Sequence, residues 1–102
     1  MTETSGEVQV VDNPSAERFE AIVDGHLAQL AYRRDTERLV LVHAEVPDEI
    51  GGRGIGGRLV RFAVDQAIAA GLLVVPRCPF ARAWLRHHPE LAGSVNIEWG
   101  KE

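Results

Sequence analysis

The chain has 102 residues, of which 45% are hydrophobic and 25% are charged, as in an ordinary single globular domain. Eleven basic and fifteen acidic residues give a formal net charge of -4. This balance disfavours nucleic acid and membranes as partners, since both select basic surfaces. A single cysteine excludes an internal disulfide framework and a cysteine-based zinc site, and we expect no metal. The sequence shows no signal core and no apolar run of membrane-spanning length, so we expect a cytoplasmic protein.

The first half of the chain predicts antiparallel strands joined by polar turns. A short β-rich run covers residues 7–11, and turn residues follow it at 12–15. Alternating apolar residues predict a second strand that ends at residue 23. Asp24-Gly25 then predicts a type I′ hairpin, because both central residues of that turn need positive φ.

The third and fourth strands follow the same logic. The return strand of the hairpin covers about residues 27–33, and residues 34–37 form a second polar turn. The apolar run 39–42 opens a fourth strand, which ends near Val46-Pro47. Because this run is continuously apolar, it predicts a central strand that is covered on both faces.

The second half of the chain changes to helical periodicity. Apolar residues at spacings of three and four predict a helix over residues 55–70, which Gly71 ends. A short buried strand, 72–75, precedes a second helix over residues 79–87. The tail after Leu91 contains alternating apolar residues, which fit either a last strand or an ordered arm.

The predicted element order is therefore β-β-β-β-α-β-α in a single domain, residues 1–102, with looser ends over about 1–6 and 95–102. One right-handed crossover through the first helix makes the fourth and fifth strands parallel.

Five glycines occur within residues 51–57, directly before the first predicted helix. Glycines let the backbone approach a ligand closely, and the helix N-terminus offers unpaired N–H groups, so together they favour a phosphate or pyrophosphate cradle. Arg53 and Arg58 are candidates for charge-assisted contacts with phosphate oxygens. The alternative is a flexible surface loop that only caps the helix.

Two common phosphate-binding loops fit this segment poorly. A nucleoside-triphosphate loop needs a lysine and a serine or threonine after its last glycine, whereas Arg58 and Leu59 stand here. The dinucleotide fingerprint matches as a string, but residues 47–51 separate the loop from its strand. No carboxylate follows about twenty residues later to bind a ribose.

The segment that contains Val46-Pro47 and residues 52–59 resembles motif A of the GNAT superfamily of acyl-CoA-dependent N-acetyltransferases. A short, single-domain branch of that superfamily is more similar still. The features shared with that branch, in order, are the Asp24-Gly25 hairpin, His43-x-Glu45-Val46-Pro47, the glycine loop and Cys78-Pro79-Phe80…Trp84-Leu85…His88-Pro89-Glu90. The resemblance implies an α/β (α+β) fold: a mixed, mostly antiparallel sheet of about five or six strands with two helices.

The resemblance also implies acetyl-CoA as co-substrate, with its pyrophosphate on the glycine loop and its pantetheine arm between the parted fourth and fifth strands. The implied cofactor-binding residues are Val46, Gly52, Arg53, Gly54, Ile55, Gly56, Gly57 and Arg58. One position departs from motif A: Gly51 stands where glutamine or arginine is usual, which removes a side-chain contact with phosphate. The sequence does not predict the two early helices that close the acceptor side of typical GNAT enzymes, because strands fill the first half of the chain.

Three residues are candidates for the chemistry of acyl transfer. His43 and Glu45 point the same way on an extended strand, near the expected thioester, and histidine suits base work at neutral pH. The alternative is a strand-end pair that faces water. Cys78 precedes Pro79 and is the expected N-cap of the second helix, where the helix dipole favours a thiolate. Three roles are open to Cys78: a nucleophile that accepts the acyl group, a general acid that protonates the CoA sulfur, or a plain buried residue.

The sequence thus predicts an N-acetyltransferase that acts on an unidentified amine, either a small molecule or a protein lysine. The alternative is a non-catalytic acyl-CoA-binding or partner-docking module. We expect Phe80, Trp84 and Leu85 to be core residues. The acidic pair Asp48-Glu49 offers a weak attraction for an amine substrate. The chain is expected to be a monomer or a weak homodimer.

Overall fold

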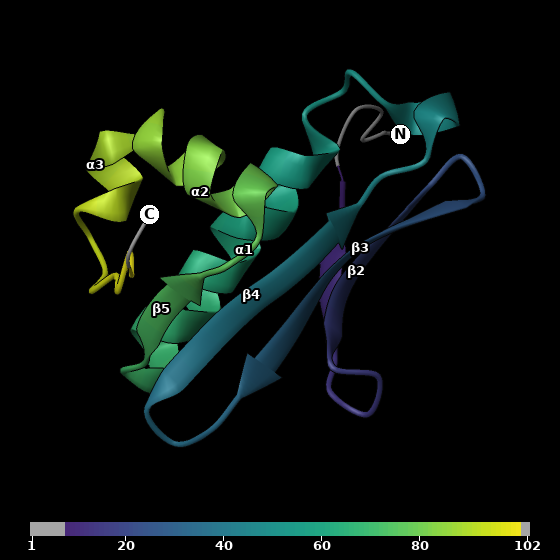
Figure 1. Ribbon diagram of the computed structural model, residues 1–102. Coiled ribbons are helices and arrows are strands. Elements are labelled where there is room, and N and C mark those ends of the chain that lie inside the picture. Colours follow the sequence, from purple (N-terminus) through teal and green to yellow (C-terminus); the bar gives the residue numbers. More distant parts are fainter. Residues whose placement is uncertain (1–7, 101–102) are drawn as a thin grey trace.

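The computed structural model describes residues 8–100, so the expected loose segment 1–6 lies outside the described residues. Its strands and its two longer helices follow in the order that the sequence predicts, with a 3-10 turn added before the first helix and one short helix added at the end (Figure 1). The strands are β1 (Val10–Asn13), β2 (Arg18–Val23), β3 (His26–Arg34), β4 (Arg38–Glu45) and β5 (Leu73–Pro76). The helices are η1 (Asp48–Ile50, a 3-10 turn), α1 (Ile55–Ala70), α2 (Pro79–Arg86) and α3 (Pro89–Ala92).

The five strands form one sheet in the order β1-β2-β3-β4-β5. The first four pair antiparallel, and β4 pairs parallel with β5 through the crossover helix α1. The mixed, mostly antiparallel sheet expected from the sequence is therefore confirmed. Asp24 and Gly25 have φ values of 51° and 78°, as the type I′ hairpin requires.

Gly71 ends α1 in the left-handed conformation, with φ 69°, and its N–H donates to carbonyls of the last turn. Pro89 follows α2 and begins the one-turn helix α3. Proline fits there since the first helical N–H needs no intrahelical acceptor.

The helices cover only one face of the sheet. Leu39 and Leu41 of β4 are fully buried on that face, together with Phe19 of β2 and with Leu30 and Tyr32 of β3. The expectation that β4 is covered on both faces is wrong, because Val42 is 40% exposed. Within residues 8–100 no helix precedes β4, so nothing shields the second face. We call this uncovered surface the open face.

A β-bulge alters β4 at its centre. Leu41 pairs with Tyr32 and His43 pairs with Ala31, which leaves Val42 as the extra residue. Strands β4 and β5 part at the same place: Leu41 opposite Pro76 is their last pair. The N–H groups of Arg77 and Cys78 both donate to the Leu41 carbonyl, at 3.0 and 2.9 Å. Beyond that point β4 and the chain leading into α2 diverge (Figure 1).

The tail lies along the outer edge of β5. Ile97 forms a single parallel bridge with Val74, and the Val74 backbone exchanges hydrogen bonds with Asn96 and Glu98 at 2.9 and 2.8 Å. One bridge makes the tail an ordered arm rather than a full sixth strand. No helix in the described part of the chain is both long and apolar enough to cross a bilayer.

Candidate functional site

The glycine loop turns tightly into α1. Gly52 and Gly54 adopt φ values of 77° and 74°, which glycine tolerates far better than other residues. Gly54 is the N-cap and provides no side chain, and the first α1 hydrogen bond runs from the Arg58 N–H to the Gly54 carbonyl. Within residues 8–100, no acceptor is bonded to the N–H groups of residues 55–57. These groups carry the positive end of the helix dipole.

The last two glycines of the loop have a packing role that the sequence analysis missed. A Cβ at Gly56 would lie 2.7 Å from the ring of Phe80, and one at Gly57 would lie 2.3 Å from Trp84 Nε1. Real side chains do not tolerate such distances. The two glycines therefore let α2 cross closely over the first turn of α1. Leu85 is core, as expected, but Trp84 is half-buried and Phe80 is 43% exposed.

An open pocket of about 300 Å³ lies beside this crossing. Its lining combines backbone at the start of α1, one indole and two guanidinium groups: Gly54, Gly57, Arg58, Arg61 and Trp84. Arg58 was expected here, whereas Arg61, one turn later on α1, was not singled out. A larger cavity of about 450 Å³ lies at the opposite end of α1, and none of the expected site residues lines it.

The remaining expected cofactor-binding residues are placed unequally. Arg53 Nη1 is 2.8 Å from Asp24 Oδ2, so the loop is tied to the β2–β3 turn by an exposed ion pair. Ile55 is 2% exposed and its side chain belongs to the core, which leaves only its backbone for a ligand. Val46 is half-buried against the same core. Gly51 donates its N–H to the Asp48 carbonyl at 3.0 Å.

His43 and Glu45 share one face of the sheet, as the strand periodicity predicts. The bulge at Val42 makes this the open face, opposite to the covered face of Leu39 and Leu41. Their partners on β3 are Ala31 and Gln29, whose side chains share that face. Both residues are exposed. Glu45 Oε1 accepts a hydrogen bond of 3.0 Å from Gln29 Nε2.

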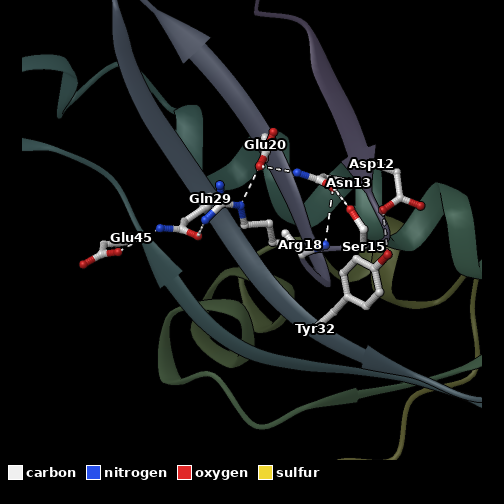
Figure 2. A network of polar contacts seen from close by, with 9 residues as sticks. Asp12, Asn13, Ser15, Arg18, Glu20, Gln29, Tyr32 and Glu45 are labelled. Atoms are coloured by element: carbon white, nitrogen blue, oxygen red, sulfur yellow. Dashed lines mark hydrogen bonds and ion pairs between the residues drawn. The ribbon is translucent and has the colours of Figure 1, made fainter.

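That hydrogen bond is the end of a network across four strands (Figure 2). Arg18 Nη1 donates to Gln29 Oε1 at 3.0 Å, and Arg18 Nε lies 2.5 Å from Glu20 Oε2. Asn13 Nδ2 donates to the same Glu20 oxygen at 3.0 Å. The hydrogen bonds from Asn13 and Arg18 lower the pKa of Glu20 below its usual value. The sequence signal for this network is the alternation of polar residues on β2 and β3.

Cys78 lies at the point where β4 and β5 part. It is the N-cap of α2, as predicted, but its thiol is 2% exposed and packs in the core on the covered side. His43 is on the open face, and no hydrogen bond within residues 8–100 joins the two side chains. Arg82 of α2 donates to the carbonyls of Pro76 and Trp99 at 3.3 and 2.7 Å.

Comparison with known proteins identifies the fold. The model of the family described as GCN5-related N-acetyl-transferase matches residues 18–94. The chain belongs to this family. The solution structure of a GCN5-like protein from Staphylococcus aureus is similar, with a TM-score of 0.68 and 25% sequence identity over 97% of this chain and 94% of that one. No curated protein matches. The resemblance and the fold class expected from the sequence are thus confirmed.

His87 and His88 at the end of α2 are otherwise engaged, since their Nδ1 atoms lie 2.8 and 2.7 Å from carbonyls of Ala83 and Trp84. The His88 ring also stacks on Trp84, with centroids 3.7 Å apart. Between residues 8 and 100, no group of three histidine, cysteine or acidic side chains is arranged to hold a metal ion.

Proposed function

We propose that this GCN5-related protein transfers the acetyl group of acetyl-CoA to a primary amine, either a small molecule or a protein lysine. The observation that carries the proposal is the parting of β4 and β5 at Leu41, next to a helix start with unpaired N–H groups. The first feature leaves β4 backbone groups free for an extended ligand, and the second suits a diphosphate. Both belong to one continuous region of the fold.

Acetyl-CoA fits the residues present. In the proposal, the diphosphate binds the backbone of residues 52–57, and Arg58 contributes charge from the neighbouring pocket. Val46 and Ile55 border the path with backbone groups. Arg53 is available for phosphate only if it exchanges its contact with Asp24. The pantetheine arm would take the place of a strand along residues 42–45 of β4.

His43 would take a proton from the acceptor, with the Glu45 carboxylate beside it on the same face. An amine enters as an ammonium ion and must lose one proton before it can attack, and His43 accepts that proton. The amine nitrogen then bonds to the thioester carbonyl carbon and the carbon–sulfur bond breaks. The nitrogen loses its second proton, and the CoA thiolate gains one. The products are an amide, free CoA thiol and one proton on the base.

Cys78 is proposed as the acid beside the departing sulfur: its thiol gives a proton to the CoA thiolate and regains one as the nitrogen loses its second proton. Acetyl transfer is direct from thioester to amine. Its burial supports this choice over an acyl-cysteine, because a thiol that is 2% exposed on the covered side is poorly placed to be attacked by a substrate entering from the open face. A proton can pass from such a thiol without the large access that acyl exchange needs.

Calorimetry and a thermal shift with acetyl-CoA test the binding step, and release of CoA thiol with an amine panel tests transfer. Ligand that binds the native state must raise the melting temperature. Failure of millimolar acetyl-CoA to do so contradicts the proposal. Binding without transfer to any amine, unchanged in His43→Ala, would instead favour the non-catalytic acyl-CoA-binding module.

The proposed use of acetyl-CoA agrees with the cytoplasmic location expected above. We further propose a monomer or weak homodimer, with no nucleic-acid or membrane partner. Size-exclusion chromatography coupled to light scattering checks the oligomeric state.

A further inference from the structure

The open face holds one polar network that the fold does not need for its core. It runs from Asn13 on β1 through Glu20, Arg18 and Gln29 to Glu45 on β4 (Figure 2). The core side of the same strands is closed by apolar contacts. Four separate strands thus contribute side chains whose last member is an exposed carboxylate.

The order of donors and acceptors fixes how the network is oriented. A guanidinium group only donates, so Gln29 must turn its carbonyl oxygen toward Arg18. Its amide nitrogen then necessarily points at Glu45. Flipping the amide would set two donors against each other at Arg18 and two acceptors against each other at Glu45. Arg18 is itself held by Glu20.

This arrangement leaves part of the hydrogen-bond accepting capacity of the Glu45 carboxylate available. Oε1 accepts from Gln29, and the carboxylate has further lone pairs for another donor. Glu45 is exposed, and it follows His43 by two residues on the same face, a separation of about 7 Å along a strand. A primary ammonium group between them would be held by one residue and deprotonated by the other.

The neighbouring surface is apolar. Ile22, which pairs with Leu27 on the next row of the sheet, is 70% exposed on the open face. An alkyl chain can lie over this row while its ammonium group reaches Glu45. The combination of a carboxylate and an adjacent apolar row suits an alkylamine better than a short, fully polar amine.

We propose that Gln29 is a positioning residue that holds Glu45 as the anchor for the ammonium group of a primary alkylamine acceptor. This inference rests on the proposed function, because only an acetyltransferase has an acceptor amine. Binding of the amine can nevertheless be tested without turnover. Arg18 keeps Gln29 in the productive orientation.

Binding is tested by titrating isotopically labelled wild-type protein with 1,5-diaminopentane and following the side-chain amide resonance of Gln29 by NMR. The uncharged pentane-1,5-diol is the control ligand. The diamine should shift this resonance and the diol should not, and the shift should disappear in Glu45→Gln. A diamine that perturbs only residues away from the open face, or that perturbs nothing, overturns the inference even if acetyl-CoA binds.

Kinetics separates positioning from general stability. Gln29→Leu should raise KM for the diamine about fivefold and leave the affinity for acetyl-CoA unchanged, whereas Gln9→Leu, an exposed site without a hydrogen bond in the described structure, should change neither. Added to Glu45→Gln, Gln29→Leu should have no further effect on KM. Independent, additive effects, or an unchanged KM in Gln29→Leu, contradict the inference. Failure of the wild-type protein to bind acetyl-CoA would instead count against the proposed function.

Discussion

Gly57 lies directly beneath the indole of Trp84, so that a Cβ on the glycine would come within 2.3 Å of Trp84 Nε1. The glycine loop therefore serves two physical requirements. Its first part turns the chain with positive φ at Gly52 and Gly54, and its last part admits α2 against α1. A glycine-rich string read only as a ligand cradle misses the second requirement.

We predict that Gly57→Ala destabilises the protein by about 1–3 kcal/mol, despite the better helix propensity of alanine, because the indole must move. Chemical denaturation measures the free energy of unfolding. In the background of Trp84→Ala, which removes the clash, the same substitution should cost much less. Equal costs in both backgrounds would show that the contact with Trp84 is not the cause.

Features that depend on neighbouring residues were predictable from the sequence. The helix over residues 55–70, its end at Gly71 and the Asp24-Gly25 turn all follow from local periodicity and turn chemistry, and the structure agrees with each. The resemblance to motif A likewise depends on a short contiguous segment. Local backbone preference and the shared family pattern act together in these places.

Features that depend on distant contacts were not predictable. Gln29 and Glu45 are sixteen residues apart and meet only through the β3–β4 register, which the bulge at Val42 shifts. The covering of β4 was misjudged because an apolar run does not tell whether a helix exists to cover its second face. The side chains that meet on the open face can therefore be identified only once the strand pairing is known, whereas the glycine loop can be identified from the sequence.

Arg58 and Arg53 should differ in their effect on acetyl-CoA binding. Arg58 lines the pocket at the start of α1, whereas Arg53 is paired with Asp24. Arg58→Gln should weaken binding about tenfold, the value of one charge-assisted hydrogen bond, and Arg53→Gln less than threefold. Calorimetry at two salt concentrations measures both. The variants are matched in charge, so a larger loss in Arg53→Gln would reverse the assignment.

The Arg53–Asp24 pair should contribute little to stability. Its side chains are 48% and 67% exposed, and exposed ion pairs are typically worth under about 1 kcal/mol. Asp24→Asn should therefore leave the denaturation midpoint nearly unchanged. Because Asp24 also occupies a turn position with φ 51°, asparagine is the suitable replacement. A large destabilisation would show that the pair organises the loop.

Cys78 provides a test of the chemical route. With direct transfer, the intact mass of the wild type stays unchanged after incubation with acetyl-CoA, and Cys78→Ala lowers the transfer rate without abolishing acetyl-CoA binding. A mass gain of one acetyl group that is absent from Cys78→Ala would establish an acyl-cysteine and refute direct transfer. The Cys78 side chain makes no capping hydrogen bond, so Cys78→Ala leaves the N-terminal hydrogen bonds of α2 unchanged.

Tyr32 should make stability fall at alkaline pH. Its hydroxyl donates to Asp12 Oδ1 at 2.6 Å, and burial, followed by this bond and the nearby carboxylate, raises its pKa from 10.0 to about 12. The folded state therefore holds the proton more tightly than the unfolded state. The resulting stabilisation is complete below pH 10 and is lost as pH rises through about 12.

Tyr32→Phe should lower stability by about 1 kcal/mol at neutral pH, through loss of the hydrogen bond, and should show a shallower decline between pH 10 and 12 than the wild type. Tyr32 is the one tyrosine in the sequence, so phenolate absorbance reports its ionisation directly. Titration of the folded protein at an ordinary tyrosine pKa, or parallel stability curves for the two proteins, would refute this account. The aromatic contact with Phe19, at 4.4 Å between centroids, is preserved in the variant and keeps the comparison specific to the hydroxyl.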